Sequence, residues 1–279
     1  MRNILIPIDF TEASLNGLRY AFEFAKKTGG RLHLFHAINP APNIADNTFR
    51  EDLSEMEGNA RIQLEEICEK LAAKSKGYTI HCTHHVSFGF AEDAILNIVR
   101  EIEIDLIVMG TKGAEGWAIF GGSLTGDVLS KTDCPVLAIP QDYNFTDISK
   151  IAFATDLLGN EKSEVNFVVE FAKAFDAHIA FLNIQKNEPD DLQDIVKTGF
   201  DLLNANEYKN MSFHIIEKDD IEEGIQDFAE KERADIIVMS TYKKGLFDRM
   251  LRKSHTRKVA GETHIPLLAM HKEKIGVKA

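Results

Sequence analysis

A glycine-rich stretch, GTKGAEGWAIFGGS at residues 110–123, has the composition of a phosphate-binding loop. It follows an apolar run, DLIVM, that predicts a buried strand, and it precedes LTGDVLSK, which predicts the start of a helix. Glycines let the backbone approach a phosphate and expose its N–H groups, and a helix N-terminus favours an anion. Ser123 and Thr125 add hydroxyl groups there. The alternative is that these glycines only serve a tight connection between strand and helix.

A carboxylate follows the first predicted strand, because NILIPID at residues 3–9 ends with Asp9. Asp9 is an acceptor suited to a ribose hydroxyl or to the amino group of a base. Ligands of open α/β sheets bind outside the C-terminal ends of the strands, where the strand order reverses. The two strand ends together predict a nucleotide, with its base and sugar near Asp9 and its phosphates near the glycines. Neither G-x-x-x-x-G-K-[ST] nor a G-x-G-x-x-G after the first strand is present.

The chain contains this pattern twice. Residues 3–9, 22–26 and 31–37 match 150–156, 169–173 and 178–184 at an offset of 147, whereas 104–109 and 135–138 match 234–239 and 266–269 at offsets of 130 and 131. In the second copy the glycine positions become Ser240, Lys243 and Lys253, and only the hydroxyl of Ser254 is kept. Lysine side chains would occupy the space left for a phosphate. The second loop is therefore predicted to have lost the ligand.

Each copy alternates predicted strands and helices. In the first copy the expected strands are residues 3–9, 31–38, 79–87, 104–110 and 135–140, and four of these five are continuous apolar runs, typical of a parallel sheet covered on both faces. Thr11 and Ser123 are predicted helix N-caps, and Gly29 is expected to end the first helix. The expected fold is α/β, with two tandem open five-stranded parallel sheets. The predicted domains are 1–142 and 147–279, joined by a polar linker within 141–149.

The motifs ILIPIDFTEAS, LFHAIN and IDLIVMGTKG…GGS…DCPVLAIP resemble those of universal stress proteins, the UspA superfamily, over nearly the whole chain and in both copies. The resemblance implies the strand order 3-2-1-4-5. It also implies binding of ATP, with or without Mg²⁺, through the pattern G-2x-G-9x-G-[S/T]. Single-domain members dimerise through their fifth strands, so the resemblance implies an intramolecular pseudo-dimer of the two domains, with a homodimer left open.

The resemblance assigns roles to single residues. Ile8 and Asp9 would meet adenine and ribose, Ala37 would line the adenine pocket, Met109 and Gly110 would lie beneath the ribose, and Gly113, Gly122, Ser123 and Leu124 would bind phosphates. This sequence has eight residues between Gly113 and Gly122 where the family pattern has nine. Either the connection is tighter or the helix starts one residue later, which affects the phosphate end of the site more than the adenine end.

Composition limits the other functions. The net charge of -12 argues against sequence-independent nucleic-acid binding, and no apolar run approaches the roughly 20 residues of a membrane helix. Without an export signal, Cys68, Cys82 and Cys134 are expected to be reduced thiols of a cytoplasmic protein. A basic segment, residues 243–258, is expected to form a solvated helix face, with an anionic partner as the alternative.

Metal binding and catalysis find little support in the sequence. The stretch HCTHH at residues 81–85 is rich in metal-ligand types, but His81 and His85 would lie about 13 Å apart on one strand, so no metal site is predicted. No G-x-S-x-G motif is present, and Glu115 and Asp127 could at most assist a slow ATPase. The leading hypothesis is a cytoplasmic, ATP-binding stress-response protein. The alternatives are an adenine-nucleotide hydrolase or transferase, and a scaffold that binds no nucleotide.

Overall fold

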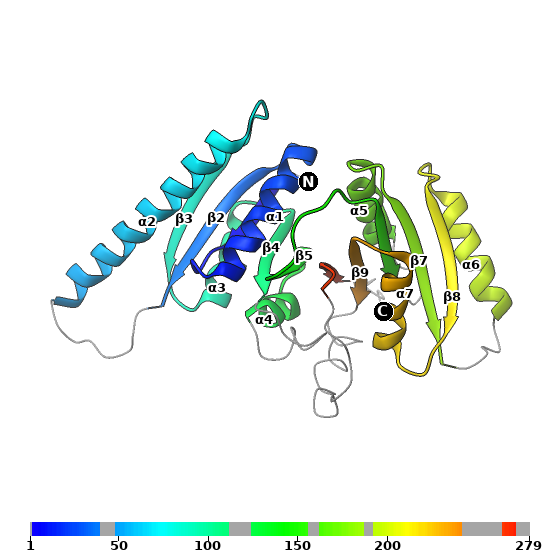
Figure 1. Cartoon of the computed structure of the whole chain (residues 1–279). Coiled ribbons are helices and arrows are strands. Elements are labelled where there is room, and N and C mark those ends of the chain that lie inside the picture. The colour runs from blue at the N-terminus through cyan, green and yellow to red at the C-terminus, as the bar shows by residue number, and fades with distance from the viewer. Residues whose placement is uncertain are drawn as a thin grey trace. The chain divides into compact units, whose positions relative to one another are not determined.

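The computed structural model describes residues 2–39, 48–111, 124–155, 162–186, 192–241 and 264–271. These residues separate into two compact units, with the break between Phe145 and Thr146 (Figure 1). Each unit is a five-stranded parallel sheet with helices packed on it, as the sequence predicts.

The first unit has the elements β1 Asn3–Pro7, α1 Glu12–Thr28, β2 Arg31–Ile38, α2 Thr48–Lys74, β3 Cys82–Phe88, α3 Ala91–Glu101, β4 Leu106–Thr111, α4 Leu124–Lys131 and β5 Val136–Pro140. Its strands lie in the order β3-β2-β1-β4-β5, with every recorded pair parallel. Right-handed crossovers place α1 and α2 on one face and α3 and α4 on the other. The predicted order 3-2-1-4-5 is confirmed.

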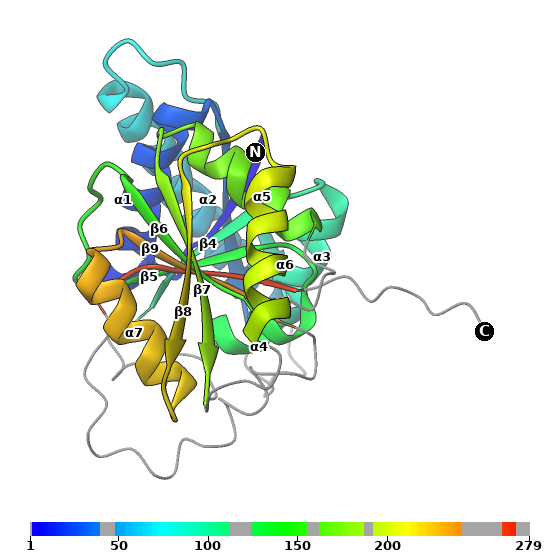
Figure 2. The same ribbon diagram turned by 90° about the vertical axis from the view of Figure 1, so that its right-hand side faces the viewer.

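The second unit has the elements β6 Lys150–Ala154, α5 Lys162–Lys173, β7 His178–Gln185, α6 Leu192–Ala205, β8 Met211–Glu217, α7 Ile221–Glu232, β9 Ile236–Thr241 and β10 Leu267–His271. Its strands lie in the order β8-β7-β6-β9-β10, again parallel, so the topology of the first unit recurs (Figure 2). Strands β6 and β7 begin and end exactly 147 residues after β1 and β2, which confirms the repeat read from the sequence.

The first helix has the predicted ends. The Thr11 side chain caps α1 by accepting the Ser14 N–H, and Gly29 ends the helix in the left-handed region at φ 71°. The buried face of α1 carries Tyr20 and Phe24, both almost fully enclosed. None of the described helices has the length and apolar character needed to cross a membrane.

The segment after β5 is anchored on α1, although the sequence predicts a polar linker there. The Asn16 side-chain amide donates hydrogen bonds to the carbonyl oxygens of Pro140 (2.9 Å) and Tyr143 (2.8 Å). The Tyr20 ring contacts the rings of Tyr143 and Phe145, at centroid distances of 6.1 and 4.9 Å. Tyr143 and Phe145, both half-buried, thus pack on α1 of the first unit.

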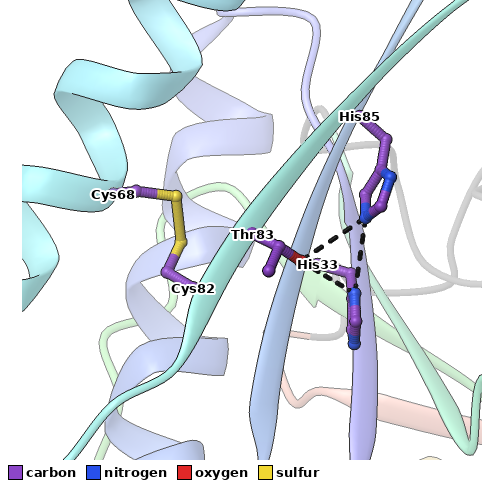
Figure 3. The surroundings of a disulfide bond; sticks show 5 residues. All are labelled: His33, Cys68, Cys82, Thr83 and His85. Atoms are coloured by element: carbon purple, nitrogen blue, oxygen red, sulfur yellow. Dashed lines mark hydrogen bonds between the residues drawn. A yellow bond between two sulfur atoms is a disulfide. The ribbon is translucent and has the colours of Figure 1, made fainter.

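The prediction of three reduced thiols is wrong for two of them. Cys68 of α2 and Cys82 of β3 form a disulfide, with their Cα atoms 5.6 Å apart (Figure 3). The fold brings the helix onto the strand that follows it, a contact that the odd number and wide spacing of the cysteines did not reveal. Strand β3 also begins at Cys82, three residues later than predicted.

The third cysteine remains a thiol. Cys134 donates a hydrogen bond from Sγ to the Ile104 carbonyl oxygen at 3.3 Å. Burial, assisted by the nearby Asp105 charge, raises the pKa of Cys134 to about 12. Because the thiolate is the reactive form, this half-buried cysteine should be unreactive at neutral pH.

Candidate functional site

The C-terminal end of β1 is built by hydrogen bonds to β2. The Ile8 N–H donates to the Phe35 carbonyl oxygen at 2.7 Å, and the Ile8 side chain is buried. The Ile8 carbonyl oxygen accepts a hydrogen bond from His36 Nδ1 at 2.7 Å, which assigns the ring proton to that nitrogen. The same ring packs against Phe10, whose φ of 61° turns the chain from the strand toward α1. These contacts fix the direction in which the next side chain leaves the strand.

Asp9 stands exposed at this turn. Its carboxylate Oδ1 accepts hydrogen bonds from the Thr11 N–H (3.0 Å) and the Thr11 hydroxyl (2.5 Å). The Asp9 N–H donates to Ser14 Oγ at 3.3 Å, so backbone and side chain are both tied to the first turn of α1. A negative charge is favourable at a helix N-terminus. The carboxylate is therefore held in a defined orientation while it stays accessible to solvent.

The C-terminal end of β4 packs unusually close to α1. A Cβ atom on Gly110 would lie 1.7 Å from the Ala13 carbonyl oxygen, and one on Gly17 would lie 2.6 Å from the Gly110 N. We call this contact the glycine seam, made by Gly17 of α1 and Gly110 of β4. The sequence interpretation gave Gly110 a role beneath the ribose and overlooked Gly17. A glycine inside an otherwise strong helical pattern was the signal for such a close approach.

The predicted nucleoside-binding residues lie on three neighbouring strands. Strand β1 pairs with β2 on one side and with β4 on the other, so the strand order reverses at β1 and β4. Ala37 lies near the end of β2, Met109 is buried in β4, and Leu124 is the exposed first residue of α4. Gly113, Gly122 and Ser123 lie outside the described residues, as do Glu115 and the loop between them. The structure thus brings Ile8, Asp9, Ala37, Met109 and Gly110 to neighbouring strand ends, and their binding of a nucleoside stays a prediction.

The second unit repeats the frame at the corresponding strand ends. The Thr155 N–H donates to the Leu182 carbonyl oxygen at 2.9 Å, as Ile8 does to Phe35. The Thr155 carbonyl oxygen accepts from Asn183 Nδ2 at 3.0 Å, and Asn183 occupies the repeat position of His36. The structure does not describe the second loop, which is predicted not to bind a phosphate. Its residues Lys243, Lys253 and Ser254 lie outside the described residues, as does Asp156.

Within HCTHH, the side chains of Thr83 and His85 contact His33 of the neighbouring strand β2. His85 Nε2 lies 3.5 Å from His33 Nδ1, and the Thr83 hydroxyl lies 3.0 Å from that same Nδ1 atom (Figure 3). His33 Nε2 lies 3.3 Å from the Asn3 side-chain oxygen. Burial lowers the pKa of both histidines, and each also feels neighbouring positive charge. The described residues contain no group of three or more His, Cys, Asp or Glu suited to a metal ion.

Comparisons with known proteins agree with the repeat. The model of the universal stress protein family matches residues 1–140 and again residues 148–271. Universal stress protein G of Escherichia coli O157:H7 is 24% identical over 140 residues, which are 50% of this chain and 98% of that protein. Universal stress protein A homolog 1 of Coxiella burnetii is 27% identical over 143 residues, 50% of this chain and 95% of that protein.

Solved structures match over both units. A universal stress protein from Archaeoglobus fulgidus gives a TM-score of 0.72 at 18% identity, covering 98% of this chain and 97% of its own. A second structure, described as a putative universal stress protein from Pseudomonas aeruginosa, gives 0.60 at 15% identity, covering 97% and 93%. At these identities the likeness concerns the fold.

Proposed function

The chain belongs to the universal stress protein family, and from this premise we propose that its first domain binds an adenine nucleotide and acts in a stress response. The observation that carries the proposal is the oriented carboxylate of Asp9 at the point where the strand order reverses. An exposed carboxylate in this position is suited to accept hydrogen bonds from ribose hydroxyls. The buried Ile8 and the neighbouring Ala37 would supply the apolar surroundings of the base.

The described residues include those proposed to hold the nucleoside, but only some of those proposed to hold the phosphates. Met109 and Gly110 lie near the end of β4, the strand beside β1, and Leu124 begins a helix whose N-terminus would favour phosphate. Gly113, Gly122 and Ser123 complete the proposed cradle on the strength of the family resemblance. The proposed ligand is ATP, with or without Mg²⁺, at one site per chain. The protein would act through a conformation or an association that depends on the nucleotide.

The test is a calorimetric titration of the full chain with AMP, ADP and ATP. We expect one site per chain, with affinity rising from AMP to ATP if the phosphate cradle is intact. Equal affinities would show that only the nucleoside is held. Two comparable sites per chain would contradict a first-domain site, and no binding of any of the three would favour a scaffold.

Two variants locate the site. Asp9→Asn keeps an oxygen for Thr11 but removes the charge, and we expect affinity to fall about tenfold, because a charged hydrogen bond contributes about 1.5–3 kcal/mol. The matched control is Asp220→Asn, because Asp220 caps α7 of the second unit through the N–H groups of Glu222 and Glu223. Gly113→Val should weaken ATP binding more than AMP binding. Unchanged affinity in Asp9→Asn would remove Asp9 from the site.

Turnover separates a binding protein from an enzyme. An adenine-nucleotide hydrolase or transferase would release phosphate or pyrophosphate rapidly, and we expect a protein without such turnover.

Tandem domains also fit an intramolecular pair, which stays a prediction. The proposed compartment is the cytoplasm, but the Cys68–Cys82 disulfide weighs against a reducing environment. Alkylation of thiols in intact cells, followed by fractionation, would decide both the location and the redox state.

A further inference from the structure

The second unit carries two polar residues where the first has its glycine seam. Glu164 of α5 lies 147 residues after Gly17, and Ser240 of β9 lies 130 residues after Gly110. The sheet registers support this correspondence, because Ile4 pairs with Leu106 as Ile151 pairs with Ile236. The buried residues of the helices also correspond, with Phe171 and Ala172 of α5 at the repeat positions of Phe24 and Ala25.

Glu164 and Ser240 are deeply buried, with exposed fractions of 4% and 5%. The Ser163 hydroxyl donates to Glu164 Oε2 at 2.8 Å, which satisfies one carboxylate oxygen. Glu164 Oε1 and Ser240 Oγ have no hydrogen-bond partner within the part of the chain that the structure describes. Buried polar atoms in folded proteins nearly always have a partner, and a buried carboxylate without one is destabilising. Among the described residues, Glu164 Oε1 and Ser240 Oγ thus lack the partner that buried polar atoms normally have.

We propose that Glu164 Oε1 and Ser240 Oγ bind a monovalent alkali cation in the second unit. Both atoms are hard oxygens, the ligand type that alkali and alkaline-earth ions prefer, and the Glu164 carboxylate would repel a phosphate. A single carboxylate neutralises one positive charge, whereas a divalent ion would leave an unbalanced charge in the interior. The site lies where β6 and β9 meet and the strand order reverses, the usual ligand position in such sheets. It does not depend on nucleotide binding by the first unit.

The experiment is hydrogen exchange on the full chain in potassium, sodium or choline chloride at equal ionic strength. Choline is a bulky organic cation that should not enter a site as deeply buried as Glu164 and Ser240. We expect amides of residues 162–173 and 236–241 to exchange about tenfold more slowly at a cation concentration ten times the dissociation constant. The corresponding amides of α1 and β4 should exchange equally in all three salts, because the glycine seam offers no side-chain oxygen.

The variant Glu164→Gln keeps the size of the side chain and removes its charge, so exchange should become independent of the salt. Glu170→Gln is the matched control, because Glu170 lies on the same helix but is exposed and paired with Lys173. The comparison is the response to cation within each variant, so a general loss of stability does not affect it. Equal exchange of the wild type in all three salts would overturn the proposal. So would protection that rises only on acidification, since a proton would then be the partner of Glu164.

Discussion

The two units of the chain share a frame and differ in the chemistry placed on it. In both units, a carboxylate accepts hydrogen bonds from backbone N–H groups at the start of the first strand. In the first unit, Asp105 Oδ2 accepts from the N–H groups of Arg2 (2.7 Å) and Asn3 (2.9 Å). Asp235 Oδ2 accepts those of Ser149 (2.7 Å) and Lys150 (2.9 Å) in the same way. The two units thus share hydrogen bonds that hold the backbone and have no role in the proposed ligand binding.

The differences lie in the contacts between helix and sheet. The first unit has the glycine seam beneath α1 and the disulfide between α2 and β3. The second unit has Glu164 and Ser240 in place of the seam. A duplicated fold can therefore change the side chains between helix and sheet at a few positions without altering its strand order.

The largest expected effect breaks the glycine seam. Gly110→Ala puts a methyl group onto the Ala13 carbonyl, and we expect a loss of about 3 kcal/mol or more in the free energy of unfolding. Ser240→Ala should change stability by less than about 1 kcal/mol, because that position already has a Cβ atom. Denaturant titration measures both. Equal losses in the free energy of unfolding would show that α1 and α5 pack on their sheets in the same way.

The next effect concerns the disulfide. Replacing both Cys68 and Cys82 by Ser should destabilise the first unit by about 3 kcal/mol, as the chain-entropy model gives for a loop of this length. Hydrogen exchange should accelerate in α2 and β3 while α6 and β8 stay unchanged. Cys134→Ser is the control for loss of a thiol. An unchanged exchange rate in β3 would mean that the disulfide contributes nothing to holding this edge strand.

A smaller effect should be similar in the two units. Asp105→Ala and Asp235→Ala each leave two backbone N–H groups without their acceptor, and we expect about 1 kcal/mol for each. The Ser149 hydroxyl also donates to Asp235 Oδ2 (2.9 Å), but it is exposed and can turn to water. Denaturant midpoints, or exchange of the amides at the start of β1 and β6, report the loss. Clearly different losses would contradict a shared frame.

The smallest effect is a dependence on pH in both units. Burial lowers the pKa of His33, His85 and His214, so each folded site takes up a proton less readily than the unfolded chain, whose histidines titrate near 6.5. Their contribution to stability is complete above about pH 6.5 and is lost as the pH falls below it. The surrounding charges are Arg31, Arg61, His84 and Glu101 in the first unit, and Lys150, His178, Lys231 and Glu232 in the second.

Urea midpoints at pH 7.5 and 5.5 measure this dependence. The variant His85→Gln should reduce the loss of stability on acidification, because it removes one of the rings whose pKa burial lowers. A protein that is equally stable at both pH values would show that these rings carry no coupled protonation.

Much of the fold could be predicted because its signals are local. Apolar runs gave the strands, Thr11 and Gly29 marked the ends of α1, and the offset of 147 located β6 and β7. The Cys68–Cys82 pairing could not be predicted, because it depends on which turn of α2 meets β3. Of the site, the turn around Asp9 follows from adjacent residues. Gly17 within a helical pattern indicates a close approach, but its partner Gly110 lies far away in the sequence, so only the structure identifies the pair.

The anchoring of the segment after β5 decides how the protein can be divided. A fragment ending at residue 142 would remove both rings that contact Tyr20, and it would take away the Tyr143 carbonyl that Asn16 uses. The newly uncovered aromatic surface on α1 would favour self-association of such a fragment. Expression of the first domain by itself should therefore continue past Phe145, and a soluble fragment obtained that way would let each half be studied without the other.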